Sequence, residues 1–260
     1  MLRFSANLNM MFREFAFIDR FSAAAKAGFK AVEFAFPYGR FAEKLKKELA
    51  ANHLELVHIY LPAGNWPAGD RGMAVDPART EEFKKGVEQA IAYAAILGAK
   101  KINCLVGKAV DAPRIAQHYS MIKNLQYAAD RLAESGSSLL VDHVDARDMP
   151  SYFLNTAYQV LQIIKEVNRP NVYLQYNLYH AEQLDSELYH ILRDHLPRIG
   201  HIQIADNPGW HEPGTGKIDY RAALEALDRY GYNFYVGLDY VPSADTWSSL
   251  EWVRSYGYAL

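Results

Sequence analysis

Residues 137–150, SSLLVDHVDARDMP, combine an apolar run with side chains that serve acid–base and metal chemistry. The run leads directly into Asp142, His143 and Asp145. A short apolar run bounded by polar residues is typical of a buried strand. Carboxylates can take up and return protons, and their oxygens bind hard divalent cations. The stretch therefore predicts a functional site at the end of this strand.

Polar side chains also stand in or directly after the other apolar runs of the chain. The set comprises His58, Tyr60, Lys108, Asp142, His143, Gln175, Asn177, His180, Gln203, Asp206 and Asp239. Any one of them could fill a barrel interior or cap a loop. Because buried polar groups need partners, so many of them near strand ends favour one shared site. Glu33 and His201 either support this site or are core residues with partners of their own.

Eight β-rich runs alternate with segments of helical spacing. The runs are residues 2–8, 31–36, 54–61, 101–107, 138–144, 172–178, 201–206 and 235–240. Residues 81–98 and 118–136 have the spacing of helices, and the second segment ends on Gly136. The alternation predicts an α/β fold, and eight units predict a (β/α)8 TIM barrel with its site at the carboxyl ends of the strands. A doubly wound open sheet is the alternative. No linker divides the chain, so residues 1–260 are predicted to form a single domain.

The composition, with 50% hydrophobic and 22% charged residues, is that of a soluble enzyme with a large core. The 260 residues carry a formal net charge of -2, which argues against nucleic acid and membrane surfaces as partners. No run approaches the roughly 18 apolar residues of a membrane helix, and the first residues lack a signal-peptide pattern. The single Cys104 excludes an internal disulfide and fits a reducing compartment. We therefore predict a cytoplasmic protein, and the sequence leaves a homo-oligomer open.

Six segments of the chain are similar to one known family. They are LRFSANLNMMF, GFKAVEFAFPY, LPAGNWPAGDRG, KKINCLVGK, HIQIADNPGWHEPGTGKIDY and VGLDY. Through them the chain resembles the hydroxypyruvate isomerase family of xylose-isomerase-like barrels over nearly its whole length. The resemblance implies Mg²⁺ or Mn²⁺, held by two glutamates, an aspartate and a glutamine or histidine at the ends of strands 5 to 8. It also implies that the two glutamates move a proton between adjacent carbons of a small 2-hydroxy carbonyl compound.

The resemblance assigns roles to particular residues of this chain. The implied metal ligands are Asp142, Asn177, Gln203 and Asp239, and the implied catalytic pair is Asp142 and Asp239. Asp142 and Asp239 stand where the family has glutamate, and Asn177 stands where it has aspartate. The lost negative charge at Asn177 should weaken the binding of a hard cation. The predicted substrate contacts are His58, Tyr60, Trp66, Arg71, Lys108, His143 and His180.

The implied reaction passes through an enediolate, whose oxygen charge a divalent cation can stabilise. Because three ligand positions depart from the family, two alternatives stay open. In one, the pocket has been repurposed, by evolution or by design, and binds metal weakly or not at all. There Asp142 or Asp239 would be a base whose pKa is raised by burial. In the other, the barrel is a non-catalytic binding protein.

Overall fold

The structure is a computed structural model that describes residues 1–181 and 185–260. It is organised as two compact units. Unit 1 comprises Met1–Phe34, Glu43–Val57 and Tyr176–Leu260, and unit 2 comprises Ala35–Ala42 and His58–Gln175. The single domain over residues 1–260 stays a prediction.

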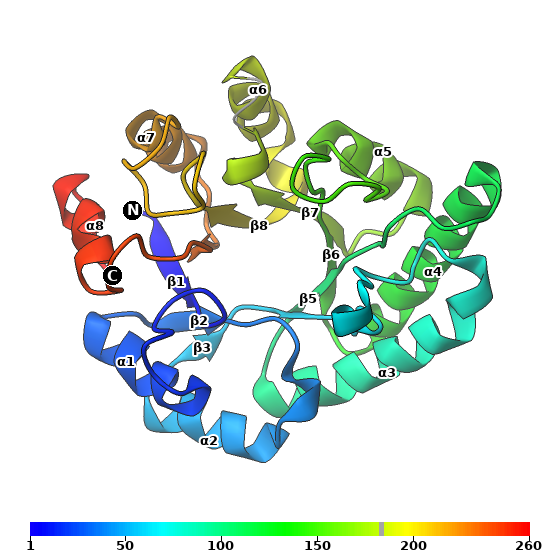
Figure 1. Cartoon of the computed structure of the whole chain (residues 1–260), viewed down its shortest axis with the longest axis horizontal. Coiled ribbons are helices and arrows are strands. Elements are labelled where there is room, and N and C mark those ends of the chain that lie inside the picture. Colours follow the sequence, from blue (N-terminus) through cyan, green and yellow to red (C-terminus); the bar gives the residue numbers. More distant parts are fainter. Residues whose placement is uncertain (182–184) are drawn as a thin grey trace. The chain divides into compact units, whose positions relative to one another are not determined.

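Strands and helices alternate along the described residues, as predicted (Figure 1). The strands are β1 (Arg3–Asn7), β2 (Ala31–Glu33), β3 (Glu55–Leu56), β4 (Ile59–Tyr60), β5 (Lys101–Cys104), β6 (Ser138–Val141), β7 (Val172–Asn177), β8 (Ile199–Ile204) and β9 (Tyr235–Leu238). The α-helices are α1 (Arg20–Ala27), α2 (Ala42–Ala51), α3 (Thr80–Leu97), α4 (Arg114–Glu134), α5 (Ala157–Val167), α6 (Asp185–His195), α7 (Tyr220–Tyr230) and α8 (Glu251–Ser255).

The strands of unit 1 lie in the order β3-β2-β1-β9-β8 and pair in parallel. Asn7 lies opposite Glu33, while Ser5 and Gln203 both lie opposite Gly237. In Figure 1, α1 and α2 lie beside β2 and β3. Because parallel strands end at the same edge, this register gathers polar residues of several strands near their carboxyl ends.

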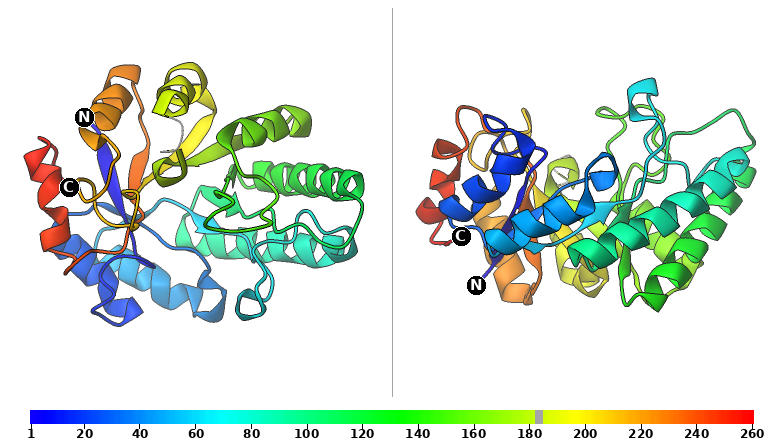
Figure 2. Two further views of the ribbon diagram at one scale, coloured as in Figure 1. Left: turned by 45° about the horizontal axis from the view of Figure 1, so that its top comes forward. Right: turned by 90° about the horizontal axis from the view of Figure 1, so that it is seen from below.

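The strands of unit 2 lie in the order β4-β5-β6-β7, again in parallel. Asn103 lies opposite Tyr60, and Cys104 lies opposite Val141. Helices α3 and α4 pack side by side (Figure 2). Since β6 ends at Val141, Asp142 follows directly at its carboxyl end.

The prediction of one continuous strand over residues 54–61 is wrong. These residues form β3 and β4, so the described residues contain nine strands where eight were predicted. The physical reason is a change of hydrogen-bond partner along the run. The N–H of Val57 donates to the carbonyl of Val32 in unit 1, whereas that of Leu61 donates to Asn103 in unit 2.

Two sequence predictions concern the helices, one on how the second predicted helix ends and one on membrane-spanning segments. Helix α4 ends at Glu134, and Gly136 two residues later has a φ of +66°, a conformation that favours glycine after a helix. Among the helices of residues 1–181 and 185–260, none has the length and apolar character needed to cross a membrane.

Candidate active site

Asp142 in unit 2 is a buried carboxyl group in a polar niche. The hydroxyl of Tyr152 donates to its Oδ1 over 3.0 Å, and Asn103 on the neighbouring β5 also lies beside it. Burial raises the pKa of Asp142 from 3.8 to about 7, because an ionised carboxylate loses hydration there. The bonds from Tyr152 and Asn103 favour the ionised form and lower the pKa in part. A carboxyl group with a pKa near neutrality can both accept and return a proton.

Tyr152 is held in place by the backbone around it. Its oxygen accepts a hydrogen bond from the N–H of Val106 at 2.9 Å, so the hydroxyl proton is left for Asp142. Lys108 pairs with Tyr152 in an isolated antiparallel bridge, which sets the segment after β5 against residue 152. The half-buried Lys108, a predicted substrate contact, therefore lies on the same segment as this support for Asp142.

Three further predicted substrate contacts in unit 2 are adjacent to other polar or aromatic groups. The amide of Gln175 donates to the Tyr60 hydroxyl over 2.8 Å, and the rings of His58 and Tyr60 are 5.4 Å apart. His143 is buried directly after Asp142. Asp145, a second acid of residues 137–150, accepts hydrogen bonds from the backbone and side chain of Arg147, as expected of a turn residue.

The loop after β4 presents Trp66 and Arg71 together. The Arg71 guanidinium lies 3.8 Å from the centre of the Trp66 ring, and Trp66 remains 41% exposed. Asp70 ties the loop by accepting from the backbone of Asn65 at 2.7 Å and from Arg79 at 2.8 Å. The hydrogen bonds from Arg79 and Asn65 outweigh desolvation and lower the pKa of Asp70. The loop thus offers a fixed aromatic surface with a cation over it.

Asp239 in unit 1 is held by two side-chain amides. Asn7 donates to its Oδ1 over 2.7 Å, and Asn177 donates to its Oδ2 over 2.9 Å. The oxygen of the Asn177 amide accepts from the N–H of Tyr179 at 3.0 Å, which fixes the direction in which its nitrogen points. Two predicted ligands, Asn177 and Asp239, are therefore in direct contact, and their partner Asn7 was not predicted.

Gln203, the third predicted ligand of unit 1, is bonded to Glu33. Its Nε2 donates to Oε1 of Glu33 over 2.6 Å, and both side chains are buried. Ser5 and His201 contact the other carboxyl oxygen of Glu33 at 2.9 Å each. Glu33 and His201 are thus buried with partners, as either of the two interpretations requires.

A third cluster of unit 1 contains the predicted substrate contact His180. Its ring lies 5.3 Å from that of Trp210, and the rings of Tyr179 and Trp210 are 3.9 Å apart. The indole N–H of Trp210 donates to the backbone carbonyl of Asp239. Buried Asp206 accepts from three backbone N–H groups of the loop that carries Trp210, those of Asn207, Gly214 and Ile218. The loop is therefore an ordered part of the strand ends.

The donor set of unit 1 fits a hard divalent cation in the type of its ligands. Asp239 supplies a carboxylate, while Asn177 and Gln203 supply amide oxygens. The nitrogen of Gln203 is turned to Glu33, so its oxygen faces away from that carboxylate, whereas the oxygen of Asn177 already accepts from the N–H of Tyr179 and keeps one lone pair for a cation. Glu33 and His201 are also of residue types that bind cations. Unit 1 therefore contains residues that could hold a divalent cation, with one charge fewer than an aspartate at position 177 would give.

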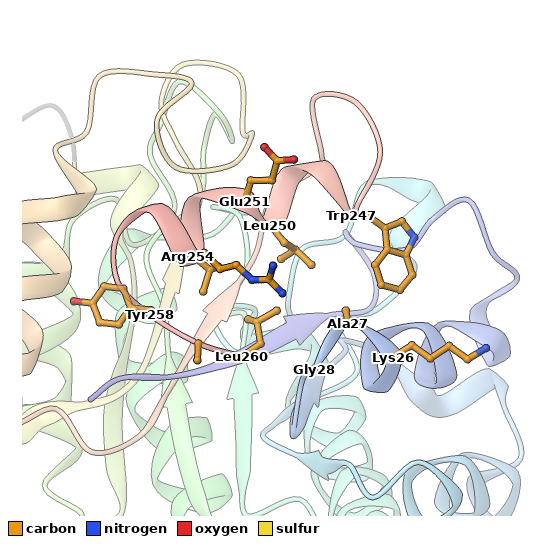
Figure 3. A pocket seen from close by; sticks show the side chains of 11 residues that line it. Lys26, Ala27, Gly28, Trp247, Leu250, Glu251, Arg254, Tyr258 and Leu260 are labelled. Carbon is orange, nitrogen blue, oxygen red and sulfur yellow. The ribbon is translucent and has the colours of Figure 1, made fainter.

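A cavity of about 550 Å³ in unit 1 lies elsewhere (Figure 3). Its wall comes from α1, from α8 and from the last residues of the chain, and includes Lys26, Gly28, Trp247, Glu251, Arg254 and Leu260. No residue predicted for the site belongs to this wall. The strand ends, and not this cavity, carry the predicted chemistry.

Three residues that contact the predicted site residues were missed from the sequence. Asn7, Tyr152 and Trp210 stand in segments with no recognisable catalytic spacing. The loop 211–216 after the seventh predicted strand could be a plain turn or part of the rim of the site. Its attachment to Asp206 favours the second, although the role of Trp210 required the structure.

Comparison with known proteins gives a match over nearly the whole chain. Residues 21–256 match the protein family described as "Xylose isomerase-like TIM barrel". The chain is 44% identical over 257 residues to hydroxypyruvate isomerase of Escherichia coli (strain K12), covering 98% of this chain and 100% of that protein. It is 39% identical over 257 residues to 2-oxo-tetronate isomerase of Cupriavidus necator, covering 98% and 99% of the two chains.

A solved structure agrees with these matches. The crystal structure described as AP endonuclease, family 2, from Brucella melitensis superposes with a TM-score of 0.95 and 39% identity, covering 98% of this chain and 99% of the other. The predicted (β/α)8 barrel is thereby confirmed, and the alternative of a doubly wound open sheet is wrong. The assignments of individual ligands and catalytic residues stay predictions.

Proposed function

Since the chain belongs to the hydroxypyruvate isomerase family of xylose isomerase-like TIM barrels, we propose that it moves a carbonyl group between adjacent carbons of a small hydroxy-carbonyl acid. Its curated relatives are isomerases, in agreement with the predicted enzyme class. The observation that carries the mechanism is Asp142, whose pKa is raised to about 7 by burial at the end of β6. Hydroxypyruvate and 2-oxo-tetronate are the substrates to be tested first.

In this mechanism the ionised form of Asp142 removes the proton from the carbon next to the carbonyl. The resulting carboxylic acid then returns the proton one carbon away, and Asp239 would carry the hydroxyl proton from the oxygen that becomes the carbonyl to the former carbonyl oxygen. Tyr152 keeps Oδ1 of Asp142 oriented throughout, because its own oxygen is fixed by the backbone of Val106. The amides of Asn7 and Asn177 hold both oxygens of Asp239 in one direction. Fixed orientation of acid–base groups is a large part of their catalytic effect.

A divalent cation, Mg²⁺ or Mn²⁺, is proposed as the cofactor. Asp142, Asn177, Gln203 and Asp239 are the candidate ligands. When bound, it would supply positive charge to the oxygens of the enediolate. The two amide oxygens are weak ligands compared with carboxylates, so we expect a modest affinity.

The substrate's carboxylate requires a cationic partner, and unit 2 offers two candidates. Arg71 lies over the exposed ring of Trp66, and Lys108 stands on the segment that supports Tyr152. A guanidinium binds a carboxylate through two parallel hydrogen bonds, which would orient a short acid. We further propose a cytoplasmic enzyme without nucleic-acid or membrane partners, in agreement with the single buried Cys104.

The proposed function is tested by proton NMR of hydroxypyruvate incubated with the protein in D2O. Exchange of the carbon-bound protons, together with a new aldehyde signal, is the expected result. Asp142→Asn should abolish both the proton exchange and the aldehyde signal. Asp148→Asn, the same change at an exposed acid six residues further on, should keep them. Failure of the native chain to exchange protons of either substrate, with Mn²⁺ or without it, would contradict the proposal.

Metal-free catalysis has one observation in its favour. Both oxygens of Asp239 already accept hydrogen bonds from neutral amides, which orient the carboxylate without a cation. Proton exchange that persists in excess EDTA at an unchanged rate would select this version. Exchange that EDTA removes and Mn²⁺ restores would select the metal-dependent one.

A further inference from the structure

Glu33 is a carboxyl group on which three strands of unit 1 converge. It is fully buried at the end of β2 and is contacted by Ser5 of β1 and by His201 and Gln203 of β8. The shortest contact, 2.6 Å, joins Oε1 of Glu33 to Nε2 of Gln203. A buried carboxyl group is costly unless it is hydrogen-bonded, and both oxygens here have partners. The side chain is therefore held in one orientation.

Strand β9, which pairs with β1 and β8, leaves space for the carboxyl group of Glu33. Gly237 on β9 lies opposite both Ser5 and Gln203. The hydroxyl group of Ser5 and the amide group of Gln203 both donate to Glu33. A Cβ at Gly237 would lie 2.5 Å from Oε2 and 2.6 Å from Oε1 of Glu33, well inside van der Waals contact. Glycine at this position thus allows Glu33 to reach the side chain of Gln203.

The contact decides which end of the Gln203 amide faces the strand ends. A primary amide has nearly the same shape when its oxygen and nitrogen are exchanged, so hydrogen bonding must select one orientation. A carboxylate oxygen accepts, and only the NH₂ group of the amide can donate to it. Since Nε2 is turned to Glu33, the carbonyl oxygen of Gln203 is directed away from it.

We infer that Glu33 is a positioning residue that presents the carbonyl oxygen of Gln203, and not its NH₂ group, to the cation and substrate. The inference rests on the proposed function, in which Gln203 is a ligand through oxygen. With the amide reversed, two N–H groups would face the cation. Partners that orient metal ligands in this way typically change affinity or activity by about 10- to 100-fold when they are substituted.

The test uses the full chain and variants that differ only in this contact. Glu33→Gln keeps the size of the side chain but can accept and donate, so Gln203 is no longer held in one orientation. Gly237→Ala removes no polar group and displaces the carboxyl group by steric overlap. Ser5→Ala is the matched control, because it removes a hydrogen bond from Oε2 and leaves the bond on Oε1.

The first measurement is the dissociation constant for Mn²⁺, from the EPR signal of the free ion. We expect Glu33→Gln and Gly237→Ala to weaken binding about 10- to 100-fold, with Ser5→Ala within about threefold of the native chain. The double variant Glu33→Gln, Gln203→Glu should restore binding, because the amide and the carboxylate have exchanged places. Equal binding by Glu33→Gln and Ser5→Ala would overturn the inference.

A second measurement decides the inference even if the chain binds no Mn²⁺. In the metal-free protein, the side-chain amide protons of Gln203, assigned by their loss in Gln203→Glu, should exchange with solvent at least tenfold more slowly than in Glu33→Gln. Ser5→Ala should keep the slow exchange. Slow exchange without Mn²⁺ binding by any form would leave Glu33 as the orienting group and count against the proposed metal. Equal exchange in native protein and Glu33→Gln would overturn the positioning role itself.

Discussion

Replacing Asp142 by asparagine should change how the stability of the protein depends on pH. Asparagine has the size of aspartate and retains an oxygen that can accept from the Tyr152 hydroxyl, but it does not titrate. The pKa of Asp142 is about 7 in the folded chain and 3.8 for an ordinary aspartate. A carboxyl group with a raised pKa holds its proton more tightly when folded. Its contribution to stability is therefore fully present below about pH 4 and is lost as the pH rises to about 7.

The magnitude follows from the two pKa values. The full penalty for ionising the buried group is about 4 kcal/mol above pH 8, since each tenfold change in proton affinity corresponds to about 1.4 kcal/mol. Part of that penalty is already present at pH 5. At this pH the carboxyl group is ionised in the unfolded chain and must take up a proton when the chain folds. Between pH 5 and pH 8, we expect the native chain to lose about 3 kcal/mol of unfolding free energy relative to Asp142→Asn.

Urea denaturation of both proteins at pH 5 and pH 8 measures this quantity. The buffers should contain EDTA, because a cation bound to the ionised carboxylate would oppose the effect. Asp148→Asn is the control for an exposed carboxyl group and should change little between the two pH values. If the difference between native chain and Asp142→Asn changes by less than about 0.5 kcal/mol across this interval, burial does not perturb Asp142 and the reasoning is refuted.

Three further substitutions test other contacts of the site. Tyr152→Phe removes a hydrogen bond that lowers the pKa of Asp142, so the acid limb of the kcat/KM profile should move to higher pH, by about one unit. Asn177→Asp places a second carboxylate beside Asp239, so it should lower Tm in EDTA and enlarge the rise in Tm on adding Mn²⁺. Asp206→Ala leaves three backbone N–H groups without their acceptor and should cost about 3 kcal/mol or more in urea denaturation, with Asp206→Asn losing less.

The fold could be predicted from the sequence because its signal is local and repeated. Each β-rich run is bounded by turn residues and followed by helical spacing, and this alternation needs no knowledge of distant contacts. The ends of the strands were less certain, since β2 and β6 are several residues shorter than their predicted runs. The break within 54–61 depends on which strand pairs with each half, and a sequence pattern does not contain that information.

The site was predictable only in part, for a related physical reason. Asp142, Gln203 and Asp239 were predicted from strand ends and from the resemblance, and their roles stay predictions. Their partners are set by the register between strands and by loop geometry. Asn7 and Asp239 are 232 positions apart, yet their side chains are 2.7 Å apart. Tyr152 reaches Asp142 through a loop that has no catalytic pattern.

The two carboxylates lie in different environments, which suit them to different roles in the proposed mechanism. Asp142 is buried, its pKa is about 7, and it receives a hydrogen bond from one phenol, so it can gain and lose a proton near neutrality. Asp239 is half-buried, and two amide donors hold both of its oxygens. Divergent environments of this kind separate acid–base roles in carboxylate pairs.

We therefore expect the pH dependence of kcat/KM to follow Asp142. Asn7→Ala should lower kcat/KM at every pH without moving the profile, because it removes one of the two amides that hold Asp239 and leaves the contacts of Asp142 unchanged. A profile that moved in Asn7→Ala and stayed in place in Tyr152→Phe would reverse this assignment.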